Sequence, residues 1–180
     1  MPSRWFKRKE EPKAPPPAEK PAAPALKGVS IGGLLTEELV VFRPPAQNKE
    51  QLIETLVAKL CAVKGLGDPS PFFHKVLERE GGISTTLDTG LRLPHARVDG
   101  ISDISTILGL LPQGLPDPKQ PDLPIRAMFL FFSPTRQEAV RQHLQLLRSV
   151  AALFQAPFID ELLKSPDPAA VLQLIRSREA

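Results

Sequence analysis

Cysteine and the larger aromatic residues are nearly missing from this sequence of 180 residues, which contains one cysteine, one tryptophan and no tyrosine. A lone cysteine has no disulfide partner in the chain. Cys61 falls within an apolar helical run, where we expect a small core residue. A cysteine–histidine nucleophile pair is not favoured, because nothing near Cys61 in the sequence would lower the pKa of its thiol. A Gly-rich phosphate loop of the Walker type is also missing.

Long apolar runs are absent as well. No stretch approaches the roughly 18 apolar residues of a membrane span, and no apolar signal-peptide segment follows the basic residues near the start. We therefore expect a cytoplasmic protein with no direct membrane span. Three histidines and one cysteine without short ligand spacing do not make a metal pattern, so neither a metal nor a cofactor is expected.

Proline and charge divide the chain into two parts. Residues 1–27 hold seven of the 21 prolines and almost no large apolar side chain, which predicts a disordered basic Pro-rich tail and a packed domain over 28–180. Seven basic and three acidic residues give the tail a charge of +4, against +3 for the whole chain, so the domain carries −1. A nucleic-acid partner is therefore not expected. The tail is interpreted as a solvated linker, although its basic and aromatic start would also suit an anionic membrane or an acidic partner.

Hydrophobic periodicity predicts helices on both sides of a central strand region. Apolar residues recur at helical spacing over 49–63, 70–79, 136–154, 156–163 and 167–175. Between them, the apolar runs 104–111 and 125–132 predict strands covered on both faces. The five prolines of 112–124 predict a surface loop. This order indicates an α/β layered domain with helices on both faces of a sheet.

The three histidines are the candidate reactive groups. His74 lies in a predicted helix without an acid–base partner at useful spacing, so a surface or packing role is expected. His95 directly follows a proline, with an arginine on either side. His143 falls on or beside the apolar face of a long predicted helix. On these grounds alone, an ordinary loop histidine and a hydrogen-bonded core histidine remain open interpretations.

A spaced set of residues ahead of His95 resembles a known active-site signature. Residues 79–95 follow the pattern R-E-x3-S-T-x4-G-x3-P-H, which is similar to that of enzyme IIA domains of the mannitol/fructose and nitrogen-regulatory type (PTS EIIA type-2). An apolar strand ending at Pro134 and a second histidine, His143, extend the resemblance over nearly the whole domain. It implies a single three-layer α/β domain, with a mixed sheet of about five strands flanked by helices on both faces.

The resemblance also implies a function, that of a histidine phosphocarrier in a phosphoenolpyruvate-dependent sugar phosphotransferase system. As a phosphotransferase component, His95 would accept a phosphoryl group from HPr, or from its nitrogen-branch counterpart, and pass it to a IIB domain. Arg79 matches the family arginine and would clamp the phosphoryl oxygens. His143 matches the second active-site histidine and would support the group, with hydroxyl hydrogen bonds from Ser84 and Thr85.

Some residues leave alternatives open. Glu80 would either orient Arg79 or be a simple helix-end charge. Arg92 and Arg97 are expected to be solvated loop charges. Asp88 and Arg92 depart from the family's usual residues, which motivates the alternative of a fold-mate without phosphotransfer. A further alternative is a stand-alone regulatory (nitrogen-type) IIA protein whose phosphorylation state controls partner proteins, because no IIB or IIC segment is fused to this sequence.

Overall fold

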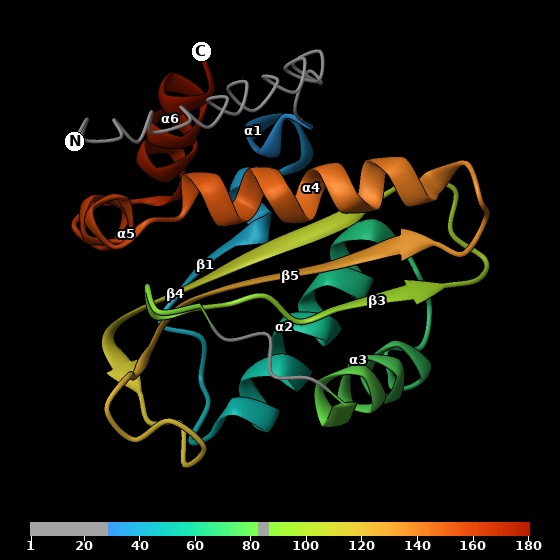
Figure 1. Ribbon diagram of the computed structural model, residues 1–180, viewed down its shortest axis with the longest axis horizontal. Coiled ribbons are helices and arrows are strands. Elements are labelled where there is room, and N and C mark those ends of the chain that lie inside the picture. The colour runs from blue at the N-terminus through green and yellow to red at the C-terminus, as the bar shows by residue number, and fades with distance from the viewer. Residues whose placement is uncertain (1–28, 83–86) are drawn as a thin grey trace, which may run out of the picture.

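The computed structural model describes residues 29–82 and 87–180. The predicted tail over 1–27, Ser84 and Thr85 lie outside the described residues. In the described part, five strands form one mixed sheet between two layers of helices (Figure 1). The elements follow one another as α1 (Ile31–Leu34), the 3-10 helix η1 (Glu37–Leu39), β1 (Val40–Phe42), α2 (Lys49–Lys64), α3 (Ser70–Gly82), β2 (Leu91–Arg92), β3 (His95–Val98), β4 (Ser105–Leu115), β5 (Ile125–Pro134), α4 (Ala139–Leu153), α5 (Ala156–Leu163) and α6 (Pro168–Glu179).

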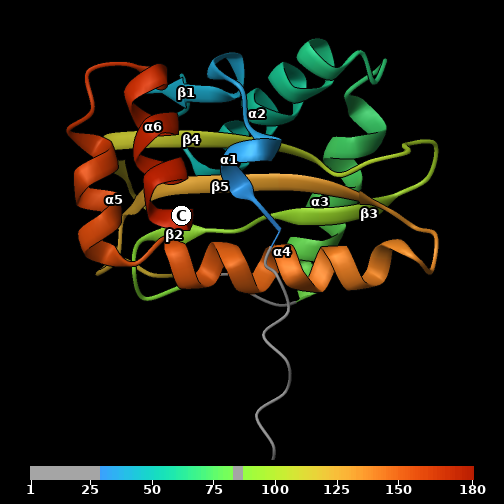
Figure 2. The same ribbon diagram turned by 90° about the horizontal axis from the view of Figure 1, so that it is seen from above.

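Helices cover both faces of the sheet, and the two longest strands are buried between them. α2 and α3 lie on one face, while α1, α4, α5 and α6 lie on the other (Figure 1, Figure 2). Nearly every residue of β5 is buried, as its continuous apolar run predicts. The predicted α/β fold with a mixed sheet of five strands and helices on both faces is confirmed. No helix in the described parts of the chain is long and apolar enough to cross a bilayer.

The topology places β3 at an edge of the sheet. The order is β1-β4-β5-β2, and β3 also pairs directly with β5, further along that strand than β2 does. The two short strands β2 and β3 therefore lie one after the other along the same side of β5. β1 runs parallel to β4, β4 runs antiparallel to β5, and β2 and β3 run parallel to β5. Pro94 interrupts this edge, but its carbonyl oxygen still accepts a hydrogen bond from Phe131 N–H at 3.2 Å. His95 therefore begins β3 directly opposite Phe131.

The surface loop predicted over 112–124 is partly wrong. β4 continues through Pro112 to Leu115, so the loop begins only at residue 116. Proline is tolerated there because the β4–β5 register shifts between Leu110 and Leu115, and the missing N–H breaks no regular ladder. Within the remaining loop, Asp117 is buried.

Two helix boundaries also differ from the prediction. α3 extends to Gly82, three residues past its predicted end. α4 begins at Ala139 rather than at 136. The chain before α4 is still held at the edge of the sheet, because Thr135 N–H donates to Val98 O at 3.2 Å. The start of a helix is therefore delayed here by a tertiary contact that its own sequence does not reveal.

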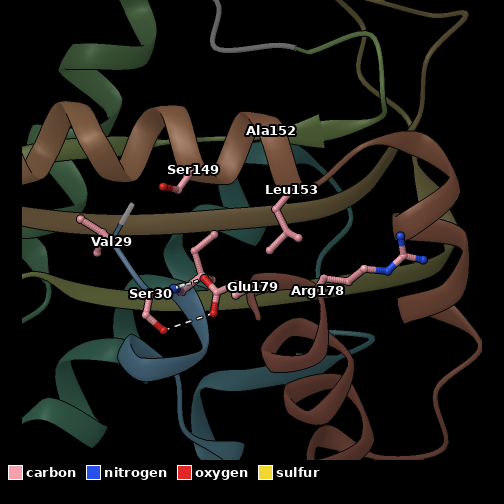
Figure 3. Close-up of a pocket in the computed structure, with 8 residues that line it drawn as sticks. Val29, Ser30, Ser149, Ala152, Leu153, Arg178 and Glu179 are labelled. Carbon is pink, nitrogen blue, oxygen red and sulfur yellow. Dashed lines mark hydrogen bonds between the residues drawn. The ribbon is translucent and has the colours of Figure 1, made fainter. Parts of the chain in front are cut away.

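One carboxylate of α6, that of Glu179, connects this helix to α1. Glu179 accepts hydrogen bonds from the hydroxyl of Ser30 at 3.2 Å (Figure 3) and from the N–H of Ile31. It also accepts one from the N–H of Gly32 at 2.9 Å. These N–H groups belong to the first turn of α1, where a helix has no backbone acceptors of its own. A cavity of about 410 Å³ lies beside this contact, lined by α1, α4 and α6.

Candidate functional site

His95 lies in a small aromatic cluster on the α4 side of the sheet. It is 6% exposed, and its ring stacks on that of Phe131, with centroids 5.2 Å apart and planes 9° from parallel. His143, from α4, lies with its ring centroid 5.2 Å from each of these two rings. The structure thus brings together the two histidines that the resemblance singled out, 48 positions apart in the sequence.

The hydrogen bonds of His95 define its tautomer. Nδ1 lies 2.8 Å from the carbonyl oxygen of Leu93. A carbonyl oxygen only accepts, so Nδ1 carries the proton and Nε2 of the neutral ring has the free lone pair. Burial lowers the pKa of His95 below its usual value, and the charge of Arg79 lowers it further, while the Leu93 hydrogen bond and Glu80 oppose the shift. The ring is therefore neutral at pH 7.

His143 is held in the complementary tautomer. Its Nδ1 lies 2.6 Å from Oγ of Ser133, a fully buried residue of β5. In the described ranges, that hydroxyl has no other hydrogen-bond partner, so it donates its proton to Nδ1 and leaves Nε2 as an N–H donor. Burial, followed by the proximity of His95, Arg97 and Arg79, lowers the pKa of His143 to about 4. His143 is thus a neutral hydrogen-bond donor at pH 7.

A cavity of about 670 Å³ opens beside the two histidines, between α3, β3 and α4. Its lining residues are Lys75, Glu78 and Arg79 from α3, His95, Ala96 and Arg97 from β3, and His143, Leu144 and Leu147 from α4. Three cations against one carboxylate favour an anionic ligand. Arg79, the residue that matches the family arginine, is exposed on α3 and lines this cavity.

The expectation that Arg92 is a solvated loop charge is wrong. Arg92 is 1% exposed, and its Nε and Nη2 donate to one carboxylate oxygen of Asp117 at 3.2 and 3.1 Å. Its Nη2 also donates to Gln120 at 3.2 Å. The partner lies 25 positions away in the chain, in a segment predicted to be a surface loop, so the local sequence does not indicate the pair.

Arg97 is not a solvated loop charge either. Its guanidinium is bonded to backbone carbonyl oxygens of the last residue of β5 and of the turn that follows. Asp88 is exposed, and neither Asp88 nor Arg92 lines the cavity. The two departures that motivated a fold-mate without phosphotransfer therefore do not oppose an anion at this site.

Other contacts of the site were not anticipated. Glu80 is buried and pairs with Lys49 of α2 at 3.4 Å, a partner that neither interpretation of Glu80 included. Phe131 and Ser133 were visible only as parts of an apolar strand. Their contacts with the histidines follow from the β3–β5 register and the position of α4, for which the sequence offers no local signal. His74 is exposed on α3, which agrees with its predicted surface role.

Solved structures of enzyme IIA proteins have the same fold. Nitrogen regulatory protein IIA-Ntr from Neisseria meningitidis superposes with a TM-score of 0.71 at 22% identity, covering 81% of this chain and 98% of that one. A complex of enzyme IIA mannitol and phosphorylated enzyme IIB mannitol from Escherichia coli matches with a TM-score of 0.66 at 22% identity, covering 80% and 98%. The fold is therefore that of phosphotransferase-system IIA domains.

The family follows from the sequence match. The model of the family described as phosphoenolpyruvate-dependent sugar phosphotransferase system, EIIA 2, matches residues 33–178, and the chain belongs to this family of phosphotransfer components. The fructose-specific EIIA component of Haloferax volcanii is 24% identical over 139 residues, 77% of this chain and 89% of that protein. The nitrogen regulatory protein of Pseudomonas aeruginosa is 26% identical over 149 residues, 82% and 95%. The resemblance noted in the sequence is confirmed, and the relatives divide between sugar-specific and nitrogen-regulatory proteins.

Proposed function

We propose that this protein is a histidine phosphocarrier of a phosphoenolpyruvate-dependent sugar phosphotransferase system, which accepts a phosphoryl group from HPr on His95 and passes it to a IIB domain. The observation that carries the proposal is the hydrogen bond from His95 Nδ1 to the Leu93 carbonyl oxygen. It leaves Nε2 as the nucleophilic nitrogen of a neutral ring that lines a cation-rich cavity.

The transfer is a direct displacement at phosphorus. The lone pair of Nε2 forms a bond to phosphorus as the bond between phosphorus and the donor's imidazole nitrogen breaks, and that nitrogen keeps the electron pair. Nδ1 remains protonated, and the Leu93 carbonyl stabilises the positive charge that develops on the ring. The neutral N–H of His143 donates to a phosphoryl oxygen, and Arg79 adds positive charge at the mouth of the cavity. Such transfers depend mainly on positioning and on charge stabilisation.

The surface next to the cavity suits docking of a second protein. Leu144 is 59% exposed, and Leu144 and Leu147 line the cavity beside His143. An exposed leucine at the mouth of a polar site provides apolar contact area for a partner that brings or removes the phosphoryl group. The IIA mannitol protein of Escherichia coli forms a complex with a phosphorylated IIB protein, which supports a IIB domain as the acceptor here.

Labelling by phosphorylated HPr tests the acceptor assignment. Wild-type protein and the variants His95→Ala and His74→Ala are incubated with HPr, enzyme I and radiolabelled phosphoenolpyruvate. Wild type and His74→Ala should take up an acid-labile phosphoryl group, and His95→Ala should take up none. His74 is the matched control because it is exposed and does not line the cavity. Full labelling of His95→Ala would show that another residue accepts the group.

A stand-alone regulatory IIA protein is the second candidate. It is favoured by the match to the nitrogen regulatory protein of Pseudomonas aeruginosa, which extends over 95% of that protein. Here the phosphorylation state of His95 would control a partner protein instead of feeding a permease. Affinity capture with phosphorylated and unphosphorylated protein separates the two: a regulatory partner should bind one state only. Recovery of a IIB protein alone, and equally in both states, counts against this role.

A further inference from the structure

Arg97 has an unusual set of partners. Its Nη2 donates to the carbonyl oxygens of Thr135 at 2.7 Å and Arg136 at 3.0 Å, and Nη2 and Nε approach the carbonyl oxygen of Pro134 at 3.3 and 3.4 Å. No Asp or Glu oxygen of the described ranges lies within ion-pair distance of this guanidinium. Carbonyl oxygens orient a guanidinium but do not neutralise it. Arg97 is therefore a fixed cation whose charge is not cancelled.

This charge borders the cavity that contains His95. Arg97 follows His95 by two positions on β3, so both side chains project from the same face of the strand. Both residues line the cavity, together with His143. The charge of Arg97 also contributes to the low pKa of His143, after burial and His95, as expected for a cation close to that ring.

The end of β5 and the turn that follows it position both groups. Ser133 holds His143 through its side chain, and the next three residues, Pro134 to Arg136, hold Arg97 through their carbonyl oxygens. Nη1 of Arg97 has no hydrogen-bond partner in the part of the chain that the structure describes. Arg97 and His143 both line the cavity, so Nη1 of Arg97 and Nε2–H of His143 are the donors that these two side chains have left for a ligand.

We infer that Arg97 binds the phosphoryl group: its free Nη1 edge donates to a phosphoryl oxygen of the group carried on Nε2 of His95. The inference rests on the proposed function and adds a second cation to it. A donor fixed before the reaction costs no reorganisation when charge arrives, which is the condition for strong stabilisation. Arg79 differs from Arg97 in being exposed and in having no hydrogen bond or ion pair to another described residue.

Kinetics and phosphorus NMR of full-length variants test the inference. Arg97→Gln should lower kcat/KM for phosphorylation by phospho-HPr by about 100-fold, the usual effect of removing one preorganised donor. Arg97→Lys should recover only part of the rate, because an ammonium keeps the charge but loses the planar fork. In the ³¹P titration of the phosphohistidine, Arg97→Gln should raise the phosphoryl pKa, because the cation that favours the dianion is gone.

Arg178→Gln is the matched control. It removes an arginine from α6, one whose guanidinium bonds to Glu161 and does not line the cavity. Its phosphorylation rate and ³¹P titration should equal those of wild type. A wild-type rate and titration for Arg97→Gln would overturn the inference while His95→Ala still takes no label. Labelling of His95→Ala would instead overturn the proposed function.

A measurement on wild-type protein covers the case in which Arg97→Gln does not fold. Phosphorylation of His95 should shift the ¹⁵N guanidinium signals of Arg97 and leave those of Arg178, which is bonded to Glu161, unchanged. Unchanged Arg97 signals in the phosphorylated protein contradict the inference directly.

Discussion

The hydroxyl of Ser133 lies 2.6 Å from Nδ1 of His143, and both residues are buried. This contact decides which nitrogen of His143 carries the proton. A ring with a free lone pair at Nε2 would repel a phosphoryl oxygen, whereas a ring with Nε2–H donates to it. The orientation of the buried Ser133 hydroxyl therefore decides whether His143 presents a hydrogen-bond donor or an acceptor to the cavity.

Ser133→Ala should release this constraint. The free energy of unfolding should fall by about 1–3 kcal/mol, because Nδ1 of a buried ring is left without its partner. ¹⁵N shifts of labelled His143 should move from the Nε2–H tautomer towards a mixture of the two tautomers, and phosphorylation of His95 should slow. Thr106→Val is the control, since it removes another buried hydroxyl, bonded to Leu34 O, in β4. It should lower stability and leave the ¹⁵N shifts of His143 as they are.

The motif glycine Gly90 should resist substitution for two reasons. Its φ is +81°, and an added Cβ would lie 3.2 Å from the carbonyl oxygen of Pro124 and from the side chain of Arg126. Gly100 has the same φ but no atom within 4 Å of such a Cβ. Urea unfolding should therefore show a loss of about 1 kcal/mol for Gly100→Ala from the backbone alone, and a loss roughly 1–3 kcal/mol larger for Gly90→Ala from the crowding. Equal losses would show that the close approach is relieved without cost.

The buried pair of Arg92 and Asp117 should respond strongly to loss of one partner. Arg92→Met leaves the carboxylate of Asp117 buried without its cation, which should cost about 3–5 kcal/mol. The double variant Arg92→Met with Asp117→Leu should recover most of that loss, because no charge is then left in the interior. Glu161→Gln tests an exposed pair with Arg178 and should have no measurable effect. A double variant as unstable as Arg92→Met would contradict this account.

Acid should destabilise the protein through His143. Its pKa of about 4 in the folded state lies below the usual value of 6.5, so the unfolded chain takes up the proton first as the pH falls. The free energy of unfolding should therefore have its full value above pH 6.5 and decline between pH 6.5 and about 4. Urea midpoints measured across this range should fall less steeply in His143→Gln. The exposed His74 is the control, and His74→Gln should keep the wild-type slope.

The elements with local signals could be predicted from the sequence, and α2 and α5 illustrate this. α2 begins at Lys49 because the side chain of Asn48 accepts from Gln51 N–H, a cap that is visible in the sequence itself. α5 spans Ala156–Leu163 as predicted. The motif around His95 was visible for the same reason, because its members are close together in the chain.

The partners of the site residues could not be predicted, because they depend on tertiary register. Arg97 meets carbonyl oxygens 37 to 39 positions away, and Arg92 meets a carboxylate 25 positions away. Nothing near an arginine in the sequence distinguishes a solvated charge from one that the fold binds to a distant segment. His95 could be proposed from the spacing of the motif residues in the sequence. The roles of Arg97 and Ser133 depend on how the strands pair in the sheet, which the sequence does not show.

The carboxylate of Glu179 has a consequence for the order of folding. It bonds to the backbone of Ile31 and Gly32, 148 and 147 positions earlier. During synthesis from the N-terminus, residues 30–32 must wait for nearly the entire domain to leave the ribosome before these bonds form. The sheet and both histidines can assemble before that moment. We therefore expect the contact between Glu179 and α1 to be among the last to form in the domain.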